Sequence, residues 1–167
     1  MFAQVMLVCG QIMKRKIMII RNNHFPIPPN HYISQVAKAV ENVKPNSSPT
    51  TVATMGPFFD FGGVLALAIS EDGVTVLGIA CLIRNCKINK TTGRIEHVSV
   101  FPEYQRKGVG HDLVQALLRE AKILGLKVVE LTTEPARESA NILYEKLGFE
   151  RRHTNVWRYH IKNLVQT

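Results

Sequence analysis

Apolar residues recur at helical spacing in three parts of the chain, and each part predicts a helix. The first is residues 30–43, where the apolar positions are Ile33, Val36, Ala37 and Val40. The second runs from Val109 to Leu124 and stops before Gly125, a residue type that favours the position after a helix end. The third lies between Pro135 and Gly148, because Pro suits the first turn of a helix and Gly its end.

Runs rich in β-branched residues predict strands between these helices. Four of them precede the second helix, at residues 16–21, 64–70, 74–88 and 94–101. Asp72 and Gly73 join the second run to the third, and this dipeptide is a strong hairpin signal. A further turn near residues 90–93 leads into the fourth run, so we expect three consecutive antiparallel strands.

After the second helix, residues 127–133 predict one more strand, and residues 149–153 and 156–161 predict a closing hairpin. Residues 44–63 are rich in Pro, Ser, Thr and Gly and are expected to form a loop. This loop carries Phe58, Phe59 and Phe61. Two interpretations stay open for these rings: they anchor the loop to the core, or they line a substrate pocket.

These elements predict an α+β fold with a mixed, mainly antiparallel central sheet flanked by helices. A chain of 167 residues has the length of one domain with one core. We expect that domain to span residues 16–167, and residues 1–15 to be an N-terminal extension to which the sequence assigns no role.

The composition fits a soluble globular protein, with 46% hydrophobic and 20% charged residues. No apolar run approaches the roughly 20 residues of a membrane-spanning helix, so no membrane partner is expected. Cys9, Cys81 and Cys86 lack the spacing of a metal site or a disulfide framework, which indicates no metal and a reducing, cytoplasmic compartment. Residues 1–40 contain no Asp or Glu, so an organellar transit peptide or a dispensable upstream extension stays an alternative.

The net charge of +8 narrows the class of partner. The basic residues are spread along the chain, and no stripe alternates them with aromatic residues, which argues against nucleic acid. A solvated surface together with a site for a phosphate-bearing ligand is the favoured interpretation.

The run Gln105-Arg106-Lys107-Gly108-Val109-Gly110 joins the fourth strand to the second helix. The first N–H groups of a helix have no internal acceptor, and the helix dipole makes that end positive. The two glycines let a ligand lie against the backbone, and the basic pair adds charge. Strand, Gly-containing turn and helix thus predict a site for a phosphate-bearing cofactor. A plain connection is the alternative, because short basic turns are common.

Farther along, the chain reads Leu143-Tyr144-Glu145-Lys146-Leu147-Gly148-Phe149. The turn, the next strand and this run follow the order typical of the GNAT superfamily of N-acetyltransferases, which residues 17–162 resemble. The resemblance implies the fold of that family, acetyl-CoA as the cosubstrate, no metal, and a Q/R-x-x-G-x-G/A turn that binds the pyrophosphate. It also implies that one strand splays from its neighbour and binds the pantetheine arm through its backbone.

Carried over to this sequence, the resemblance implies a set of cofactor-binding residues and a proton donor. The cofactor-binding residues are Val98, Ser99, Val100, Gln105, Arg106, Lys107, Gly108, Val109, Gly110, His111 and Asn141. The donor is Tyr144, which would protonate the departing thiolate, whereas the residues alone favour packing for a Tyr on an amphipathic helix. Asn141 lies one helical turn before Tyr144 and shares its face, with an ordinary exposed Asn as the alternative.

Glu96 is the candidate for the general base. Residues 93–96 resemble the stretch that approaches the acceptor in small-amine members such as glucosamine-phosphate acetyltransferases. Those members have Glu-Asp where this chain has Glu96-His97. A carboxylate there would orient the amine or accept its proton through water, and a surface ion pair is the alternative. The two-residue period of a strand places His97 on the face opposite Glu96.

Two departures from a related pattern bear on the acceptor. Ribosomal-protein N-terminal acetyltransferases carry a Glu base where Thr132 stands here and an Asn where Arg137 stands. We therefore expect acetyl transfer from acetyl-CoA to a primary amine of a small metabolite, by direct attack in a ternary complex, in a monomer or homodimer. The alternatives are a protein or peptide N-acetyltransferase and a non-catalytic acyl-CoA-binding regulatory module.

Overall fold

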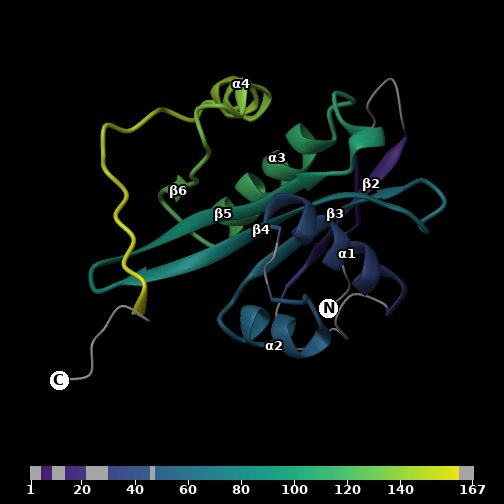
Figure 1. Ribbon diagram of the computed structural model, residues 1–167, viewed down its shortest axis with the longest axis horizontal. Helices are drawn as coiled ribbons and strands as arrows, with labels where there is room; N and C mark the ends of the chain where they lie inside the picture. Colours follow the sequence, from purple (N-terminus) through teal and green to yellow (C-terminus); the bar gives the residue numbers. More distant parts are fainter. Residues whose placement is uncertain (1–4, 9–13, 22–29, 46–47, 162–167) are drawn as a thin grey trace.

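The computed structural model describes residues 5–8, 14–21, 30–45 and 48–161, which form a sheet with helices on both faces (Figure 1). The sheet has six strands in the order β1-β2-β3-β4-β5-β6. Their bounds are β1 (Val5–Val8), β2 (Arg15–Ile20), β3 (Val64–Ser70), β4 (Val76–Lys87), β5 (Lys90–Val100) and β6 (Val129–Glu130). Neighbours from β1 to β5 pair antiparallel, and β6 pairs parallel with β5. The predicted α+β fold with a mainly antiparallel sheet is confirmed.

Two layers of helices sandwich this sheet (Figure 1). The helices are α1 (Asn30–Val43), α2 (Val52–Asp60), α3 (Val109–Ile123) and α4 (Glu138–Lys146), with a short 3-10 helix η1 (Pro102–Tyr104) before α3. Side chains of β3 alternate between the two faces of the sheet. Its Leu65, Leu67 and Ile69 pack with α1 and α2, whereas Ala66 and Ala68 pack with α3. Alternation along a fully buried strand therefore serves two separate cores.

α2 contradicts the prediction of a loop over residues 44–63. Thr51 caps the helix through reciprocal hydrogen bonds with Thr54, and Met55 and Phe59 bury one face in the core beside α1. The internal Pro57 lowers local helix propensity, but burial of two side chains four residues apart outweighs it. Phe59 thus anchors the segment, while Phe61 is exposed.

The predicted closing hairpin is wrong. Residues 149–160 contain neither helix nor strand, and residues 156–161 expose four large apolar side chains, Val156, Trp157, Tyr159 and Ile161. In Figure 1 the segment leaves α4 and runs along the outside of the molecule. Ion pairs from Arg151 to Glu145 (2.7 Å) and from Arg152 to Glu130 (2.6 Å) hold its start beside α4 and β6. The predicted strand at residues 127–133 is likewise reduced to β6.

β1 lies within the residues expected to form an extension. It pairs with β2 from Val5↔Met18 to Val8↔Arg15. β2 begins at Arg15, so the predicted boundary between residues 15 and 16 falls inside a strand. Arg15 is buried. The limits of the domain and the role of the N-terminal residues stay predictions.

Two observations concern the predicted reducing, cytoplasmic compartment: the state of the cysteines and the character of the helices. Cys81 is buried, Cys86 is exposed, and both are free thiols, whereas Cys9 lies outside the described residues. Among the residues that the structure describes, no helix has the length and apolarity needed to cross a bilayer. The cytoplasmic location stays a prediction.

β5 is irregular opposite both of its neighbours. On the β4 side, Ile79 pairs with Ser99 but Cys81 pairs with Glu96, so His97 and Val98 stand opposite the single residue Ala80. Such an extra residue is a β-bulge. On the β6 side, pairing stops at Arg94↔Glu130. From Ile95 onward, this edge of β5 has no partner strand in the described part of the chain.

Candidate functional site

The predicted anion-binding turn stands where β5 and η1 deliver the chain to α3. Gly108 is the residue before the helix and has φ 79°, in the region that favours glycine. Arg106 also has a positive φ of 58°. The Asp112 N–H donates to the Gly108 carbonyl (3.1 Å), which closes the first helical turn and leaves the preceding N–H groups without helical acceptors. The backbone therefore has the form that an anion site needs.

A buried ion pair supports this turn from β2. Arg15 donates from Nε to Asp112 Oδ2 (2.8 Å) and from Nη1 to the Lys107 carbonyl (2.9 Å), and its Nη2 also contacts Oδ2. The two side chains are 4% and 9% exposed. His111 Nδ1 lies 3.3 Å from Asp112 Oδ1. Because Asp112 places a negative charge near the expected anion, Arg15 offsets that charge and fixes the turn at the same time.

Sequence reasoning missed Arg15, although α3 carried a signal. Asp112 and Glu120 are both buried on a helix face that is otherwise apolar. Glu120 also pairs with β2, because Arg21 Nε lies 2.7 Å from its Oε2. Carboxylates on a buried face require basic partners. The pattern therefore indicated basic partners for both carboxylates, but it did not say which residues they are.

Three elements meet at Gly110. A Cβ added there would lie 3.4 Å from Leu143 Cδ2 on α4 and 3.7 Å from Val100 Cγ2 on β5. The start of α3, the end of β5 and the middle of α4 therefore converge beside the unpaired edge of β5. This placement brings the predicted turn, the predicted backbone at Val98 to Val100 and the helix of Tyr144 together.

Tyr144 is half-buried on α4. Its ring packs edge-on against Phe149, with the ring centroids 5.8 Å apart and the planes at 68°. Burial raises the pKa of its phenol, and Arg137 at the start of α4 acts in the opposite direction. The hydroxyl therefore holds its proton at neutral pH, which is the state that a proton donor needs.

Glu96 forms an ion pair with Arg94 on the same strand, and Arg94 Nη2 donates to Thr132 Oγ1 (3.1 Å). The Glu96 carboxylate therefore already has a cationic partner on its own strand. Its role as the general base stays a prediction. Its contact with an acceptor stays a prediction.

Asn141 has its amide group engaged in the loop before α4. Its Nδ2 lies within hydrogen-bond distance of three backbone carbonyls, those of Glu134 (3.1 Å), Pro135 (3.4 Å) and Arg137 (3.0 Å). This arrangement fits the alternative of a structural Asn, and its contact with a cofactor stays a prediction.

The prediction that His97 lies on the face of the strand opposite Glu96 assumes a regular strand, and the β-bulge makes the strand irregular at this point. Glu96 pairs with Cys81, which belongs to the core beside α1, whereas Val98 packs against the core beside α3. A regular strand would put residues 96 and 98 on one face. His97, between them, has φ 53°. Burial lowers the pKa of its imidazole, while Glu96 acts to raise it and Lys44 to lower it further.

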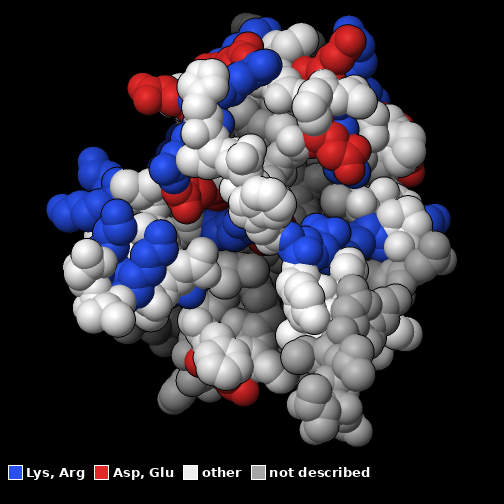
Figure 2. Space-filling view, turned by 60° about the vertical axis from the view of Figure 1, so that its left-hand side comes forward, with Lys and Arg blue, Asp and Glu red and all other residues white. Residues whose placement is uncertain are grey.

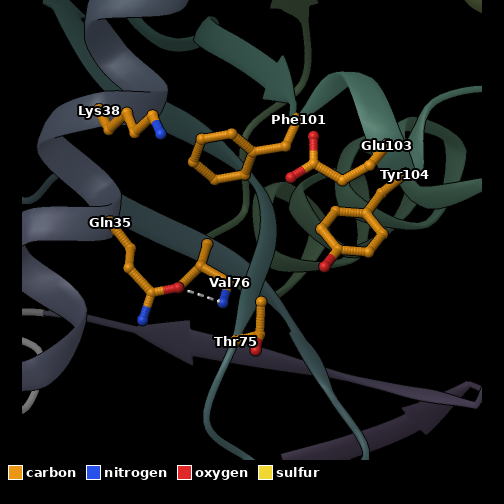
Figure 3. A pocket seen from close by; sticks show the side chains of 7 residues that line it. All are labelled: Gln35, Lys38, Thr75, Val76, Phe101, Glu103 and Tyr104. Carbon is orange, nitrogen blue, oxygen red and sulfur yellow. Dashed lines mark hydrogen bonds between the residues drawn. The ribbon is translucent and has the colours of Figure 1, made fainter.

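A separate pocket lies between α1, the start of β4 and η1 (Figure 3). Lys38 and Glu103 reach toward it from opposite sides, and Gln35 Oε1 accepts a hydrogen bond from the Val76 N–H (2.7 Å). Its volume of about 160 Å³ is below the ~300 Å³ at which ligand pockets begin. None of the predicted site residues lines it. The convergence at Gly110 therefore remains the candidate site.

The face shown in Figure 2 has a hollow with Lys and Arg side chains on both sides and with Asp and Glu side chains among them. The net charge of +8 favours the approach of anionic ligands, with a range of about one Debye length. In the part of the chain that the structure describes, no three His, Cys, Asp or Glu side chains form a group that could hold a metal ion.

Known proteins match both the sequence and the fold. A model described as "Acetyltransferase (GNAT) family" matches residues 36–149. The L-methionine sulfoximine/L-methionine sulfone acetyltransferase of Pseudomonas aeruginosa is 31% identical over 109 residues, which are 63% of each chain. N-alpha-acetyltransferase 30 of Schizosaccharomyces pombe is 35% identical over 69 residues, 41% of this chain and 45% of that protein.

A solved structure of an aminoglycoside N-acetyltransferase in complex with CoA superimposes with a TM-score of 0.70. It is 15% identical, and the match covers 92% of this chain and 99% of that one. The chain spans between 21% and 63% of the length of the curated relatives that it matches.

Proposed function

The chain belongs to the acetyltransferase (GNAT) family, and we propose that it transfers the acetyl group of acetyl-CoA to the primary amine of a small molecule. One observation carries the proposal: an open helix N-terminus, the unpaired edge of β5 and the helix of Tyr144 meet at Gly110. Anion binding, substrate alignment and proton donation then share one location.

The residues around Gly110 fit acetyl-CoA as the cosubstrate. The pyrophosphate would rest on the N–H groups of residues 108–111, with Arg106 and Lys107 beside it. The pantetheine arm would follow the backbone of residues 98–100, and the burial of the Ser99 side chain supports main-chain contacts there. Gln105 Nε2 donates to the Val100 carbonyl (3.0 Å), so this side chain fixes the turn against the strand.

The proposed reaction is direct attack of the amine on the thioester while both substrates are bound. Acetyl-CoA supplies the activated acyl group. The Tyr144 phenol donates a proton toward the departing sulfur, and Glu96 attracts the positive charge of the amine. Arg94 contacts both Glu96 on β5 and Thr132, which follows β6, beside the last paired residues of these two strands.

Gly110→Asp is expected to abolish the stabilisation that acetyl-CoA confers. The added side chain and its charge would occupy the space that the proposal gives to the pyrophosphate. The measurement is the melting temperature at rising acetyl-CoA, which increases by mass action on the folded state. Gly110→Ala is the matched control, because its Cβ would meet Leu143 at 3.4 Å and should preserve most of the shift. A folded Gly110→Asp protein with the full shift would place the cosubstrate elsewhere.

Two observations support a small amine as the acceptor. The relative from Pseudomonas acts on amino-acid derivatives by its name, and the structural neighbour on aminoglycosides. Glu96 also offers a negative charge for an ammonium group at the open side of the sheet. A protein N-terminus is the alternative acceptor, which the similarity to N-alpha-acetyltransferase 30 favours.

An acceptor screen distinguishes these candidates by thiol release from acetyl-CoA over amino acids, aminosugars, other amines and peptides. We expect turnover of small amines and a roughly tenfold lower kcat/KM in Glu96→Gln, because the variant keeps the shape but loses the charge that holds the cation. Glu103→Gln, in the pocket of Figure 3, is the control. Turnover of peptides alone would contradict the small-amine proposal. Acetyl-CoA binding without any turnover would favour the regulatory module.

A further inference from the structure

The bulge in β5 is a strained feature beside the unpaired edge of that strand. His97 and Val98 stand opposite Ala80 alone, and His97 has φ 53°. A positive φ is uncommon for a residue other than glycine and persists only where the surrounding structure enforces it. Bulges beside active sites re-aim side chains that a regular strand would place elsewhere.

We propose that His97 is the base that takes the proton from the acceptor ammonium, an inference that rests on the proposed acetyl transfer. His97 stands between two residues that are proposed to contact the substrates. Glu96, on one side, is the carboxylate proposed to attract the amine. Val98, on the other side, begins the backbone proposed to align the thioester. Along β5, His97 therefore stands between the residues proposed to contact the two substrates, at the point where the strand departs from regular pairing with β4 and no longer pairs with β6.

The charged groups around His97 leave its imidazole able to accept a proton at pH 7. Burial is the main influence and lowers its pKa; Glu96 on the same strand acts to raise it, and Lys44 after α1 to lower it. Arg94 is paired with Glu96. On β4, burial raises the pKa of the Cys81 thiol to about 12, so this neighbour stays uncharged. The imidazole becomes charged, and unable to act, only as pH falls through its lowered pKa.

The proton balance of the step is complete. The ammonium gives one proton to the neutral His97 imidazole, and the freed lone pair attacks the thioester carbonyl carbon. The C–N bond forms and the C–S bond breaks. The departing thiolate takes a proton from the Tyr144 phenol, which regains one from the amine nitrogen through water. The third proton stays on the amide, and the imidazolium releases its proton to solvent.

His97→Gly and His97→Asn test the inference without adding backbone strain, because both residue types tolerate a positive φ. Each is expected to match or exceed the parent in melting temperature and to keep the shift with acetyl-CoA. Turnover of a primary amine at pH 7 should fall about 10²-fold. Imidazole added to His97→Gly should restore part of it, and an amine that is already neutral at pH 7 should lose far less. His153→Gln, at an exposed His, is the control.

The pH profile gives a second readout that a purely structural His97 would not move. Lys44→Met should shift the acidic limb of kcat/KM to higher pH, because it removes a charge that lowers the pKa of His97. Glu96→Gln should shift the limb to lower pH for the opposite reason. An NMR titration of the His97 ring without substrate should show the same two directions.

His97 is not the base if the parent acetylates amines and His97→Asn keeps the parental rate. The same holds if the loss is equal for charged and neutral amines and imidazole restores nothing. If the parent binds acetyl-CoA but acetylates no amine, the proposed function fails, and the inference on His97 fails with it.

Discussion

Arg15→Met is expected to lower the free energy of unfolding by about 3–5 kcal/mol, the usual loss when one partner of a buried ion pair is removed. The change would leave the carboxylate of Asp112, which is 9% exposed, charged and without its arginine. It would also free the Lys107 carbonyl in the turn. Urea unfolding followed by circular dichroism measures the effect. Because the turn is the proposed pyrophosphate site, the shift in melting temperature with acetyl-CoA should shrink as well.

The neighbouring residue provides a matched control. Lys14 lies 3.7 Å from Glu71, and the two side chains are 76% and 63% exposed, so Lys14→Met should cost no more than about 1 kcal/mol. Arg15→Met combined with Asp112→Leu removes the orphaned charge too and should recover most of the lost stability. If Arg15→Met stays within about 1 kcal/mol of the parent, the pair does not hold the turn.

Tyr144→Phe is expected to reduce kcat about 10²-fold with little effect on acetyl-CoA binding. The variant keeps the ring and its edge contact with Phe149 and removes only the hydroxyl. Burial raises the pKa of that hydroxyl, so the parent should keep its proton donor up to and beyond pH ~10, the usual pKa of Tyr. Initial rates of thiol release with acetyl-CoA and the amine both saturating give kcat, and the thermal shift reports acetyl-CoA binding.

Tyr159→Phe is the control for the loss of a phenol, because Tyr159 is exposed in the C-terminal segment. Its turnover should equal that of the parent. Equal kcat in Tyr144→Phe and the parent would assign Tyr144 to packing against Phe149 and leave the thiolate to be protonated by solvent.

Elements with a strong local pattern could be predicted from the sequence. α1 has the predicted bounds because its apolar stripe is regular, and Asp72-Gly73 joins β3 to β4 as expected. α2 could not be predicted, because its stability comes from Met55 and Phe59 packing into a core assembled from distant segments. The closing hairpin failed for a related reason: residues 156–161 have strand-like composition, but a strand also needs a partner, which local sequence does not specify.

The residues of the candidate site also differ in whether local sequence predicts them. The turn could be predicted because strand, glycines and helix are contiguous in the chain. Arg15 could not, since it is 97 residues away from Asp112. The relation between Glu96 and His97 was also out of reach, because a bulge depends on the register of two strands and one extra residue cancels the two-residue period.

The exposed C-terminal segment has a consequence for spectroscopy. Trp157 is the only tryptophan of the chain and is 89% exposed. Tryptophan emission from this protein therefore originates from one hydrated ring outside both cores. Loss of the cores changes the surroundings of that ring little, so emission is a poor monitor of global unfolding. It is instead a site-specific reporter, because a shift to shorter wavelength would signal that Trp157 has become covered.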